Sequence, residues 1–317
     1  MRIVFLEENT VVLDGDIDLD GLRQLGSYRG LALDPGEDPV PLCGDAEVLI
    51  INKTKMTAGR IEALPVLRLI CVAATGYDNV DTGAAQLRGV RVANVRGYAA
   101  RSVAQHLFAM ILGFATRVPD YARDVRRGDW GGSATFHLLR YPSFELAGRV
   151  IGIVGFGAIG GNVARIAEGL GMRVLVHDVS DLSGTGYRSC TLEELLAGSD
   201  IVTLHCPLTE KTRNLIDARA LEKMKPTALL FNTARGGIVN EADLARALRE
   251  GVIAGAGVDT LTAEPPAAGN PLLEDVPNLV VTPHVAWTGR DARQRLMDGV
   301  VENIRRFRDG RFEGFVV

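Results

Sequence analysis

Three residues that follow apolar, strand-like runs have side chains suited to moving a proton beside a carboxylate. Arg235 ends one run, Glu264 comes shortly after a second, and His284 ends a third. A guanidinium fork can hold a carboxylate, an imidazole can exchange a proton with a hydroxyl near neutral pH, and a second carboxylate can orient that imidazole. Taken singly, each has an ordinary explanation, such as a surface ion pair or a structural histidine. Beside a hydride-transferring cofactor, the three together match the oxidation of an alcohol next to a carboxylate.

A glycine-rich stretch supplies the expected cofactor site. An apolar run leads into Gly155, Gly157 and Gly160, and a helical pattern follows. The first glycine permits a sharp reversal, the second lets a pyrophosphate approach the backbone, and the third lets the helix pack closely on the strand. The helix start, with Ala158 and Ile159, then faces the phosphates. The pattern predicts a dinucleotide-binding turn, and an ordinary strand–turn–helix is the alternative.

The next apolar run ends in Asp178, about 20 positions beyond the glycines, where an acidic residue binds a ribose 2′-hydroxyl. A carboxylate there would repel the 2′-phosphate of NADP, and no arginine follows it directly. The sequence therefore predicts NAD as the cofactor.

The bulk composition limits the partners and the location. With 317 residues the chain favours two domains, and its net charge of −4 gives no general attraction to nucleic acid or to an anionic membrane. The four cysteines lie far apart, without the spacing of a zinc site or a disulfide framework, so we expect no metal and reduced thiols in the cytoplasm. The N-terminus turns acidic too early for a signal peptide, and no apolar run reaches the length of a membrane span.

The elements that must position these residues alternate between strands and helices. Strands are expected at about 3–6, 47–52, 68–73, 89–94, 149–154, 172–177, 200–208, 227–237, 253–259 and 279–284. Helices are expected at about 57–64, 99–116, 192–197, 241–250 and 291–308. Such alternation predicts parallel sheets, which bind ligands at the carboxyl ends of their strands. The polar turn at 74–78 is therefore a candidate site loop, or else a plain connection.

Residues 128–146 lack a regular pattern. They carry four aromatic side chains that could cover a core, a partner subunit or a substrate mouth: Trp130, Phe136, Tyr141 and Phe144.

An ordered set of motifs over nearly the whole chain resembles the D-isomer-specific 2-hydroxyacid dehydrogenase family. The motifs are Ala74–Asp81, Arg101–His106, Gly155–Gly160, His205–Thr209 with Thr212, Asn232–Gly237, Gly257–Asp259 with Glu264 and Pro265, and Thr282–Trp287. Within the family, Glu145–Gly148 and the aromatic segment before it look most like glycerate dehydrogenases, also called hydroxypyruvate reductases. The chain departs from the pattern in several places; for example, Ala158 stands where an arginine is frequent and Gln105 where a glutamate is usual.

The resemblance implies a role for each matching position. Arg235 would bind the substrate carboxylate and carbonyl oxygen, His284 would be the general acid and base with Glu264 as its partner, and Thr75 and Gly76 would offer backbone N–H groups to the substrate. The implied cofactor contacts are Gly155, Gly157, Ala158, Ile159, Gly160, Asp178, Cys206, Thr212, Thr233, Ala234, Asp259 and His284.

The resemblance also implies an architecture and an activity. It predicts two Rossmann-like or flavodoxin-like parallel-sheet domains with a cleft between them. Residues 1–97 with 289–317 would bind the substrate, and 98–288 would bind NAD. The expected activity is hydride transfer between NAD and a small D-2-hydroxy or 2-keto acid of the hydroxypyruvate or glyoxylate type, in a homodimer. The alternatives are an NAD(H)-sensing corepressor of the same fold, a phosphoglycerate dehydrogenase and a phosphite dehydrogenase.

Overall fold

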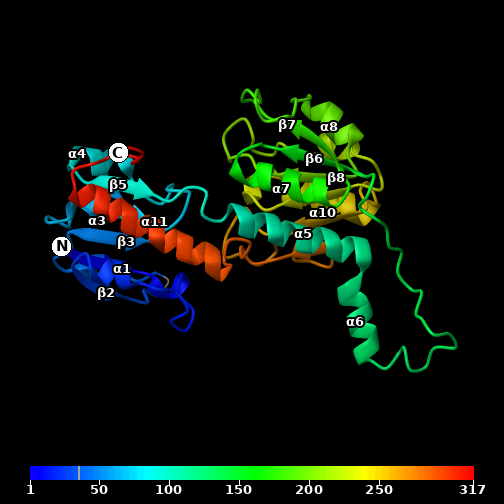
Figure 1. Cartoon of the computed structure of the whole chain (residues 1–317), viewed down its shortest axis with the longest axis horizontal. Coiled ribbons are helices and arrows are strands. Elements are labelled where there is room, and N and C mark those ends of the chain that lie inside the picture. The colour runs from blue at the N-terminus through cyan, green and yellow to red at the C-terminus, as the bar shows by residue number, and fades with distance from the viewer. Residues whose placement is uncertain (35) are drawn as a thin grey trace. The chain divides into compact units, whose positions relative to one another are not determined.

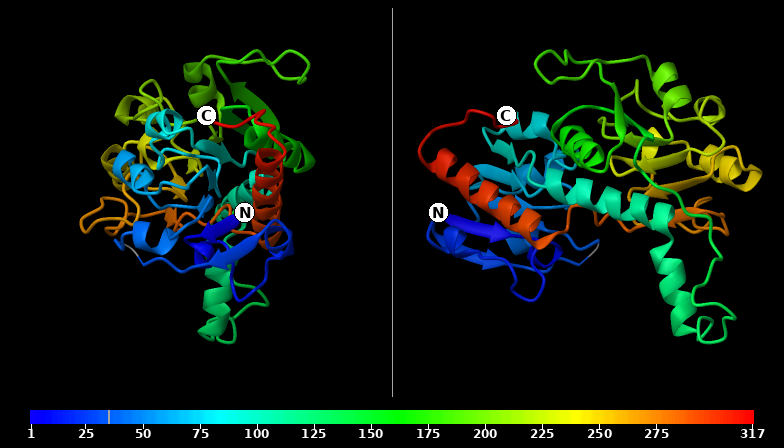
Figure 2. Two further views of the ribbon diagram at one scale, coloured as in Figure 1. Left: turned by 90° about the vertical axis from the view of Figure 1, so that its left-hand side faces the viewer. Right: turned by 45° about the vertical axis from the view of Figure 1, so that its right-hand side comes forward.

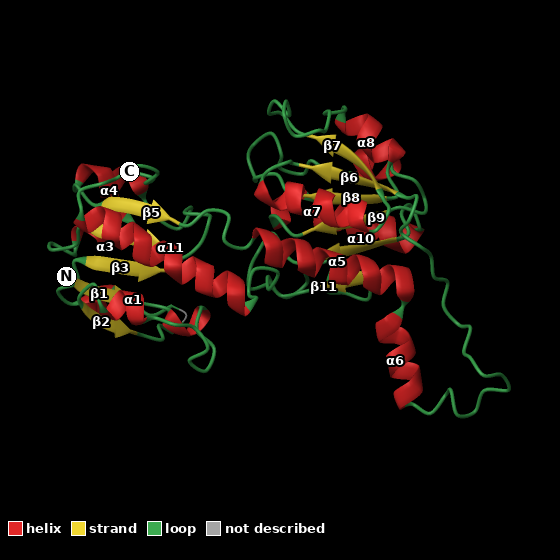
Figure 3. Cartoon of the chain, in the orientation of Figure 1, coloured by secondary structure: helices red, strands yellow, loops and turns green. Residues whose placement is uncertain are grey.

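The chain forms two compact units, each built on a parallel β-sheet. The computed structural model describes residues 1–34 and 36–317. Met1–Ala99 and Trp287–Val317 make up unit 1, and Ala100–Ala286 make up unit 2. In each unit the strands lie between helices, as Figure 3 shows by colour. The predicted fold class, two parallel-sheet α/β domains, is confirmed.

Unit 1 holds a five-stranded sheet in the order β2-β1-β3-β4-β5, with every pair parallel. This is the flavodoxin-like strand order. Its strands are β1 (Arg2–Phe5), β2 (Ser27–Gly30), β3 (Val48–Ile51), β4 (Leu69–Val72) and β5 (Arg91–Asn94). Its helices are α1 (Asp20–Arg23), α2 (Val40–Cys43), α3 (Ala58–Glu62), α4 (Thr82–Leu87) and α11 (Arg290–Arg308), with a 3-10 turn, η1, at Glu8–Thr10.

Alternation along the strands divides the interior of unit 1 into two cores, one on each face of the sheet. On β3, Val48 and Ile50 pack into the core that includes α1 and α11, whereas Leu49 and Ile51 pack into the core that includes α3 and α4. Because both faces are covered, all four residues are fully buried. The C-terminal helix α11 thus returns to the sheet formed by the N-terminal part of the chain (Figure 1).

Unit 2 holds a six-stranded parallel sheet in the order β11-β10-β9-β8-β6-β7. Its strands are β6 (Val150–Val154), β7 (Arg173–His177), β8 (Ile201–Leu204), β9 (Leu229–Asn232), β10 (Gly255–Val258) and β11 (Leu279–Val281). Its helices are α5 (Ala100–Thr116), α6 (Val118–Arg126), α7 (Ala158–Gly169), α8 (Leu192–Gly198), α9 (Ala218–Glu222) and α10 (Glu241–Glu250), with a 3-10 turn, η2, at Gly236–Ile238. The strand order reverses at β6, which pairs with β7 on one side and β8 on the other. A reversal of this kind opens a crevice at the carboxyl ends of the strands.

The sheet of unit 2 is covered by α5 and α7 on one face and by α8, α9 and α10 on the other. On β9, Leu229 and Phe231 pack toward the first group of helices and Leu230 toward the second. No described helix is both long and apolar enough to cross a membrane.

One part of unit 2 leaves the sheet. Arg117 adopts a left-handed backbone, with φ of 56°, and Pro119 lies in the first turn of α6, so the chain changes direction between α5 and α6. Residues 127–146 then return as a loop, and Figures 1 and 2 show α6 and this loop projecting from the rest of the unit. We call residues 118–146 the arm.

Candidate active site

The glycine turn between β6 and α7 has the geometry that a pyrophosphate requires. Gly155 has φ of 94°, and a β-carbon there would lie 2.6 Å from the backbone nitrogen of Cys206. A β-carbon on Gly160 would lie 2.3 Å from the carbonyl oxygen of Gly155. At Gly157, which caps the start of α7, no described atom beyond the adjacent residues of the turn lies within 4 Å of that position. Two of the glycines are therefore needed for packing, and the third leaves the open space in which phosphates can meet the N–H groups of Ala158 and its neighbours.

Asp178 lies just past the end of β7 and its carboxylate reaches back to the glycine turn. It accepts a hydrogen bond from the backbone N–H of Phe156 and another, at 2.7 Å, from that of Ser180. Partial burial acts to raise the pKa of Asp178, but these hydrogen bonds outweigh it and lower the pKa below its usual value. A negative charge is thus held beside the turn, where the ribose of the adenosine would lie.

The segments after β8 and β9 border the same edge of the sheet. The hydroxyl of Thr233 is buried and has no hydrogen-bond partner among the described residues, as expected of a group that meets a ligand. Ala234 follows it, half-buried, with its N–H donated to Asn232. After β8, the hydroxyl of Thr212 is used within its own loop, where it donates to the carbonyl of Pro207 at 2.6 Å. Thr212 therefore shapes the loop rather than presenting a free hydroxyl.

His205 and Cys206 form the wall of the turn. The His205 ring is buried, which lowers its pKa to about 3, so it is neutral. Its Nε2 lies 3.0 Å from the hydroxyl of Thr203. Burial also raises the pKa of the Cys206 thiol. Both side chains are therefore uncharged beside the glycine turn. The open space at Gly157, the unpartnered hydroxyl of Thr233 and the position of Asp178 together fit a bound NAD.

His284 and Glu264 form a close pair, with His284 Nδ1 2.6 Å from Glu264 Oε2. Glu264 lies in the loop after β10, and its other oxygen accepts from the backbone N–H of Leu261 at 2.9 Å. Because an ionised carboxylate only accepts, His284 carries a hydrogen on Nδ1, and Nε2 is left for exchange with a substrate. The backbone of His284 is left-handed, with φ of 54°, which is strained for a residue other than glycine.

Asp259, at the end of β10, is 1% exposed and holds the segment that carries His284. Its carboxylate accepts from the backbone N–H groups of Val285 at 2.9 Å and Ala286 at 3.0 Å, and from the hydroxyl of Thr282 at 2.6 Å. All of these contacts are to residues 282–286. Asp259 thus holds the segment around His284, a role that the sequence patterns did not predict.

Arg235 follows β9 and its side chain is exposed. Its guanidinium donates to the carbonyl of Ala234 at 2.8 Å, and among the described residues it has no ion pair with a carboxylate. The next residue, Gly236, packs against Leu261 and Thr262, since a β-carbon there would lie 2.0 Å from the carbonyl carbon of Leu261. The Arg235 turn and the Glu264 loop are therefore in contact at the carboxyl edge of the sheet.

Thr75 and Gly76 belong to unit 1, in the loop after β4. Thr75 is exposed, and its hydroxyl donates to the carbonyl of Val95 at 3.1 Å. Its own carbonyl accepts from the side chain of Asn94. The loop is thus tied to the end of β5, while Gly76 is half-buried.

A buried carboxylate that the sequence analysis did not single out organises this edge of unit 1. Glu7, only 7% exposed, accepts from the backbone N–H groups of Asn52 at 2.8 Å, Lys53 at 3.0 Å and Thr54 at 3.0 Å. The side chain of Asn79 donates to the carbonyls of Asn52 and Thr54, at 3.2 and 2.9 Å. The loops after β3 and β4 are therefore joined. The signal in the sequence is an acidic residue directly after a buried strand.

Comparisons with known proteins agree with this geometry. The family model described as "D-isomer specific 2-hydroxyacid dehydrogenase, NAD binding domain" matches residues 108–286. A glycerate dehydrogenase of Methylorubrum extorquens is 46% identical over 281 residues, which cover 88% of each chain. A hydroxypyruvate reductase of Blautia hydrogenotrophica is 36% identical over 316 residues, 98% of each chain. A crystal structure of a Thermus thermophilus protein superposes with a TM-score of 0.88, 34% identity and complete coverage of both chains.

The site and the comparisons lead to one family. A dinucleotide turn, a paired histidine and glutamate, and an exposed arginine lie on the edge of one sheet, and the matches to relatives extend over most of the chain. The chain belongs to the D-isomer-specific 2-hydroxyacid dehydrogenase family and is an NAD-dependent 2-hydroxyacid dehydrogenase.

Proposed function

We propose that the protein reduces a small 2-keto acid, hydroxypyruvate or glyoxylate by preference, to the D-2-hydroxy acid with NADH, and catalyses the reverse oxidation with NAD. The 2.6 Å contact between His284 Nδ1 and Glu264 Oε2 carries the proposal, because it leaves Nε2 of His284 for proton exchange. The names of two relatives, a glycerate dehydrogenase and a hydroxypyruvate reductase, support this substrate class.

The residues of this chain divide the work as follows. Arg235 binds the substrate carboxylate through its guanidinium fork and polarises the carbonyl oxygen. Thr75 and Gly76 offer backbone N–H groups to the same substrate. NADH, when bound at the glycine turn, would supply the hydride for the carbonyl carbon. His284 donates the proton to the carbonyl oxygen, and Glu264 stabilises the imidazolium before that transfer.

Two domains, whose bounds lie within two residues of those of the two units, take separate roles in this proposal. Residues 98–288 hold the cofactor through the glycine turn, Asp178, Thr233 and the segments beside them. Residues 1–97 and 289–317 bind the substrate at the carboxyl edge of their sheet. Asp178 favours NAD over NADP through its charge.

The test is NADH oxidation against hydroxypyruvate, glyoxylate, pyruvate, phenylpyruvate and 2-ketoisocaproate, with NADPH in parallel. We expect turnover of hydroxypyruvate or glyoxylate with NADH. The variants Arg235→Ala and His284→Asn should lose turnover by about a hundredfold or more and retain NADH binding. Turnover near the wild-type rate in either variant would contradict its role.

The sequence also allows two further activities and a binding role, which the relatives do not favour. No observation supports a corepressor over an enzyme, and turnover of any 2-keto acid at ordinary rates excludes it. A phosphoglycerate or phosphite dehydrogenase would use the same Arg235, Glu264 and His284, so both substrates belong in the same assay panel.

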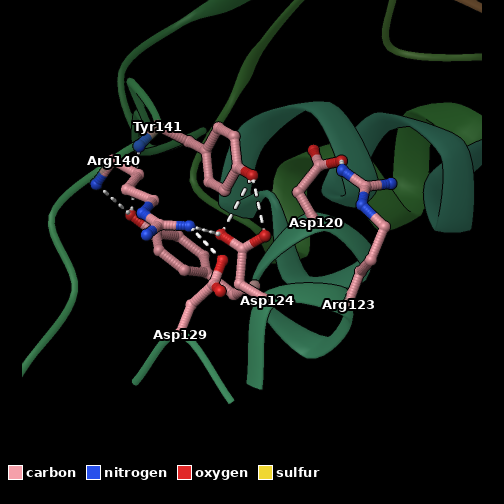
Figure 4. A network of polar contacts seen from close by, with 7 residues as sticks. Asp120, Arg123, Asp124, Asp129, Arg140 and Tyr141 are labelled. Atoms are coloured by element: carbon pink, nitrogen blue, oxygen red, sulfur yellow. Dashed lines mark hydrogen bonds and ion pairs between the residues drawn. The ribbon is translucent and has the colours of Figure 1, made fainter. Parts of the chain in front are cut away.

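We also propose a homodimer, in the cytoplasm, formed through the arm. Trp130, Phe136 and Leu139 are 52%, 88% and 84% exposed there, which is unusual for large apolar side chains in a monomer. The arm is nevertheless internally braced. Asp124, 2% exposed, accepts from Tyr141 at 3.0 Å and pairs with Arg140 at 3.3 Å (Figure 4). A braced segment with an apolar surface fits a second copy of this chain.

The free thiols of the four cysteines support the proposed location in the cytoplasm, where thiols stay reduced.

A further inference from the structure

The motif Arg101–His106 has no role in the reaction as proposed above, yet two of its side chains reach the segment that carries His284. Ser102 and His106 lie one turn apart on α5 and therefore on one face of the helix. Ser102 Oγ donates to the carbonyl of Ala286 at 2.7 Å. His106 Nε2 lies 3.0 Å from the hydroxyl of Thr282. These two contacts fix both ends of residues 282–286 to α5.

The hydrogens in these contacts can be arranged in only one order. Thr282 Oγ1 lies 2.6 Å from Asp259 Oδ1, and a hydroxyl has a single hydrogen, which an ionised carboxylate must receive. His106 Nε2 must then be the donor to Thr282. Asp259 in turn accepts from the backbone N–H groups of Val285 and Ala286. A chain of donors thus runs from α5 through Thr282 to the buried carboxylate beside His284.

The backbone of His284 depends on this chain. A left-handed conformation at a residue other than glycine persists only where its surroundings fix it. The N–H of His284 donates to the carbonyls of Asp259 at 2.8 Å and Thr282 at 3.0 Å. Both of these residues belong to the chain of donors, which therefore connects His106 on α5 to the backbone of His284.

We propose that His106 is a positioning residue for His284, acting through Thr282 and Asp259. It keeps the 282–286 segment in the geometry that holds the His284 ring against Glu264 and aims Nε2 at the substrate. The inference rests on the proposed role of His284 as the general acid and base.

Three titratable groups face the 282–286 segment from different elements. Glu264 comes from the loop after β10, Asp259 from the end of β10, and His106 from α5. Glu264 contacts the His284 ring directly, and it stabilises the protonated form that donates to the carbonyl oxygen. If the segment relaxes, that contact weakens. Reductase activity should then decline at a lower pH than in the wild type.

The test compares His106→Leu, which removes the donor, with His106→Gln, whose side-chain amide can still donate to Thr282. In His106→Leu we expect kcat to fall about tenfold or more, the scale of a misplaced catalytic group. The pH at which reductase activity falls by half should drop by about half a unit. NADH affinity and the KM for the keto acid should stay within about twofold, because Arg235 and the glycine turn are not changed.

His106→Gln should recover most of kcat and the wild-type pH profile. Gln105→Leu is the matched control, since Gln105 is an exposed neighbour on α5, and it should behave as the wild type. A profile unchanged in His106→Leu, or a His106→Gln enzyme as impaired as His106→Leu, would overturn the proposal.

Thr282→Val and Thr282→Ser test the same relay without touching α5, in case His106→Leu does not fold. Thr282→Val should show the lowered kcat and shifted profile, and Thr282→Ser should not. In the double variant His106→Leu with Thr282→Val the loss should be no larger than in either single variant; additive losses would contradict the relay.

The His284→Asn variant distinguishes a failure of the positioning role of His106 from a failure of the proposed function. Full activity in His284→Asn would show that the proposed acid and base is wrong. An inactive His284→Asn beside a fully active His106→Leu and Thr282→Val would leave the proposed function intact and reject the positioning role.

Discussion

The charge of Asp178 is the single-residue feature expected to set the cofactor preference. The Asp178→Asn variant keeps the shape of the side chain and removes the repulsion of a 2′-phosphate. We expect the ratio of kcat/KM for NADH to that for NADPH to fall about tenfold or more. Parallel steady-state assays with the two cofactors measure it.

The pH dependence of this preference follows from the lowered pKa of Asp178. A carboxyl whose pKa lies below its usual value of 3.8 remains charged until the pH falls below that value, so the preference for NADH should not weaken between neutral and mildly acidic pH. Asp181→Asn is the control, since Asp181 bonds to Ser183 within its own exposed loop. An unchanged ratio in Asp178→Asn would remove this residue from the account of specificity.

At the scale of elements, two glycines of the turn between β6 and α7 have different roles: Gly160 is needed for packing and Gly157 for cofactor binding. Gly157→Ala places a methyl group in open space, so its thermal stability should match the wild type, whereas NADH binding should weaken about tenfold or more because the methyl occupies the place of the phosphates. Gly160→Ala should lower stability, since its methyl would lie 2.3 Å from the carbonyl oxygen of Gly155.

Thermal melts and NADH fluorescence titrations of both variants provide the measurement. The two glycines serve as each other's control, because the substitution is the same and only its surroundings differ. If Gly157→Ala binds NADH as tightly as the wild type, the pyrophosphate does not lie over this residue.

The attachment of α11 to the loop before α1 gives a pH-dependent contribution to stability. Arg293, 8% exposed, donates to both oxygens of Asp16, at 2.9 and 2.6 Å, and to the carbonyl of Val11 at 2.7 Å. The hydrogen bonds from Arg293 lower the pKa of Asp16 from 3.8 to about 2. A carboxyl with a lowered pKa stabilises the folded state above its unfolded value, and this stabilisation is lost as the pH falls through the folded value.

Asp16→Asn should therefore lower Tm near pH 6 by removing the carboxylate that pairs with a buried guanidinium. The difference in Tm from the wild type should shrink as the pH falls from 3.8 toward 2. Thermal melts across this range measure it, with Asp14→Asn, in the same loop, as the control. A difference that stays constant down to pH 2 would mean that the Asp16 charge does not contribute.

Strands with a continuous apolar sequence in a buried position could be predicted. Elements and contacts that depend on residues far away in the sequence could not. The continuous apolar runs at 48–51 and 150–154 are buried on both faces, so composition alone indicates strands. The strand at Ser27–Gly30 is largely exposed and polar, so no pattern marks it. Arg235, Glu264 and His284, the proposed catalytic trio, could be singled out because each follows a strand-like run. Glu7 and the contacts of Asp259 could not, since their partners lie in other loops of the fold.

At the scale of the whole molecule, the arm is the segment whose purpose the sequence left open among a core, a partner subunit and a substrate mouth. Of the four aromatic residues in its 128–146 segment, Tyr141 reaches the buried Asp124 and packs edge-on against Tyr121 of α6, with ring centroids 5.0 Å apart. Trp130 and Phe136 remain largely exposed. The arm thus combines internal polar contacts around Asp124 with an exposed apolar surface, which is the surface assigned to the proposed dimer.

The proposed dimer predicts that Phe136→Glu combined with Leu139→Glu yields a folded monomer. Two charges on side chains that are 88% and 84% exposed cost little in the single chain, but they would be buried between copies at a large desolvation cost. Light scattering coupled to gel filtration should give twice 34.0 kDa for the wild type and 34.0 kDa for the double variant. Leu87→Glu, at a side chain 91% exposed in unit 1, should leave the dimer unchanged. A wild-type protein that elutes as a monomer, or a double variant that remains dimeric, would show that the arm does not join two copies.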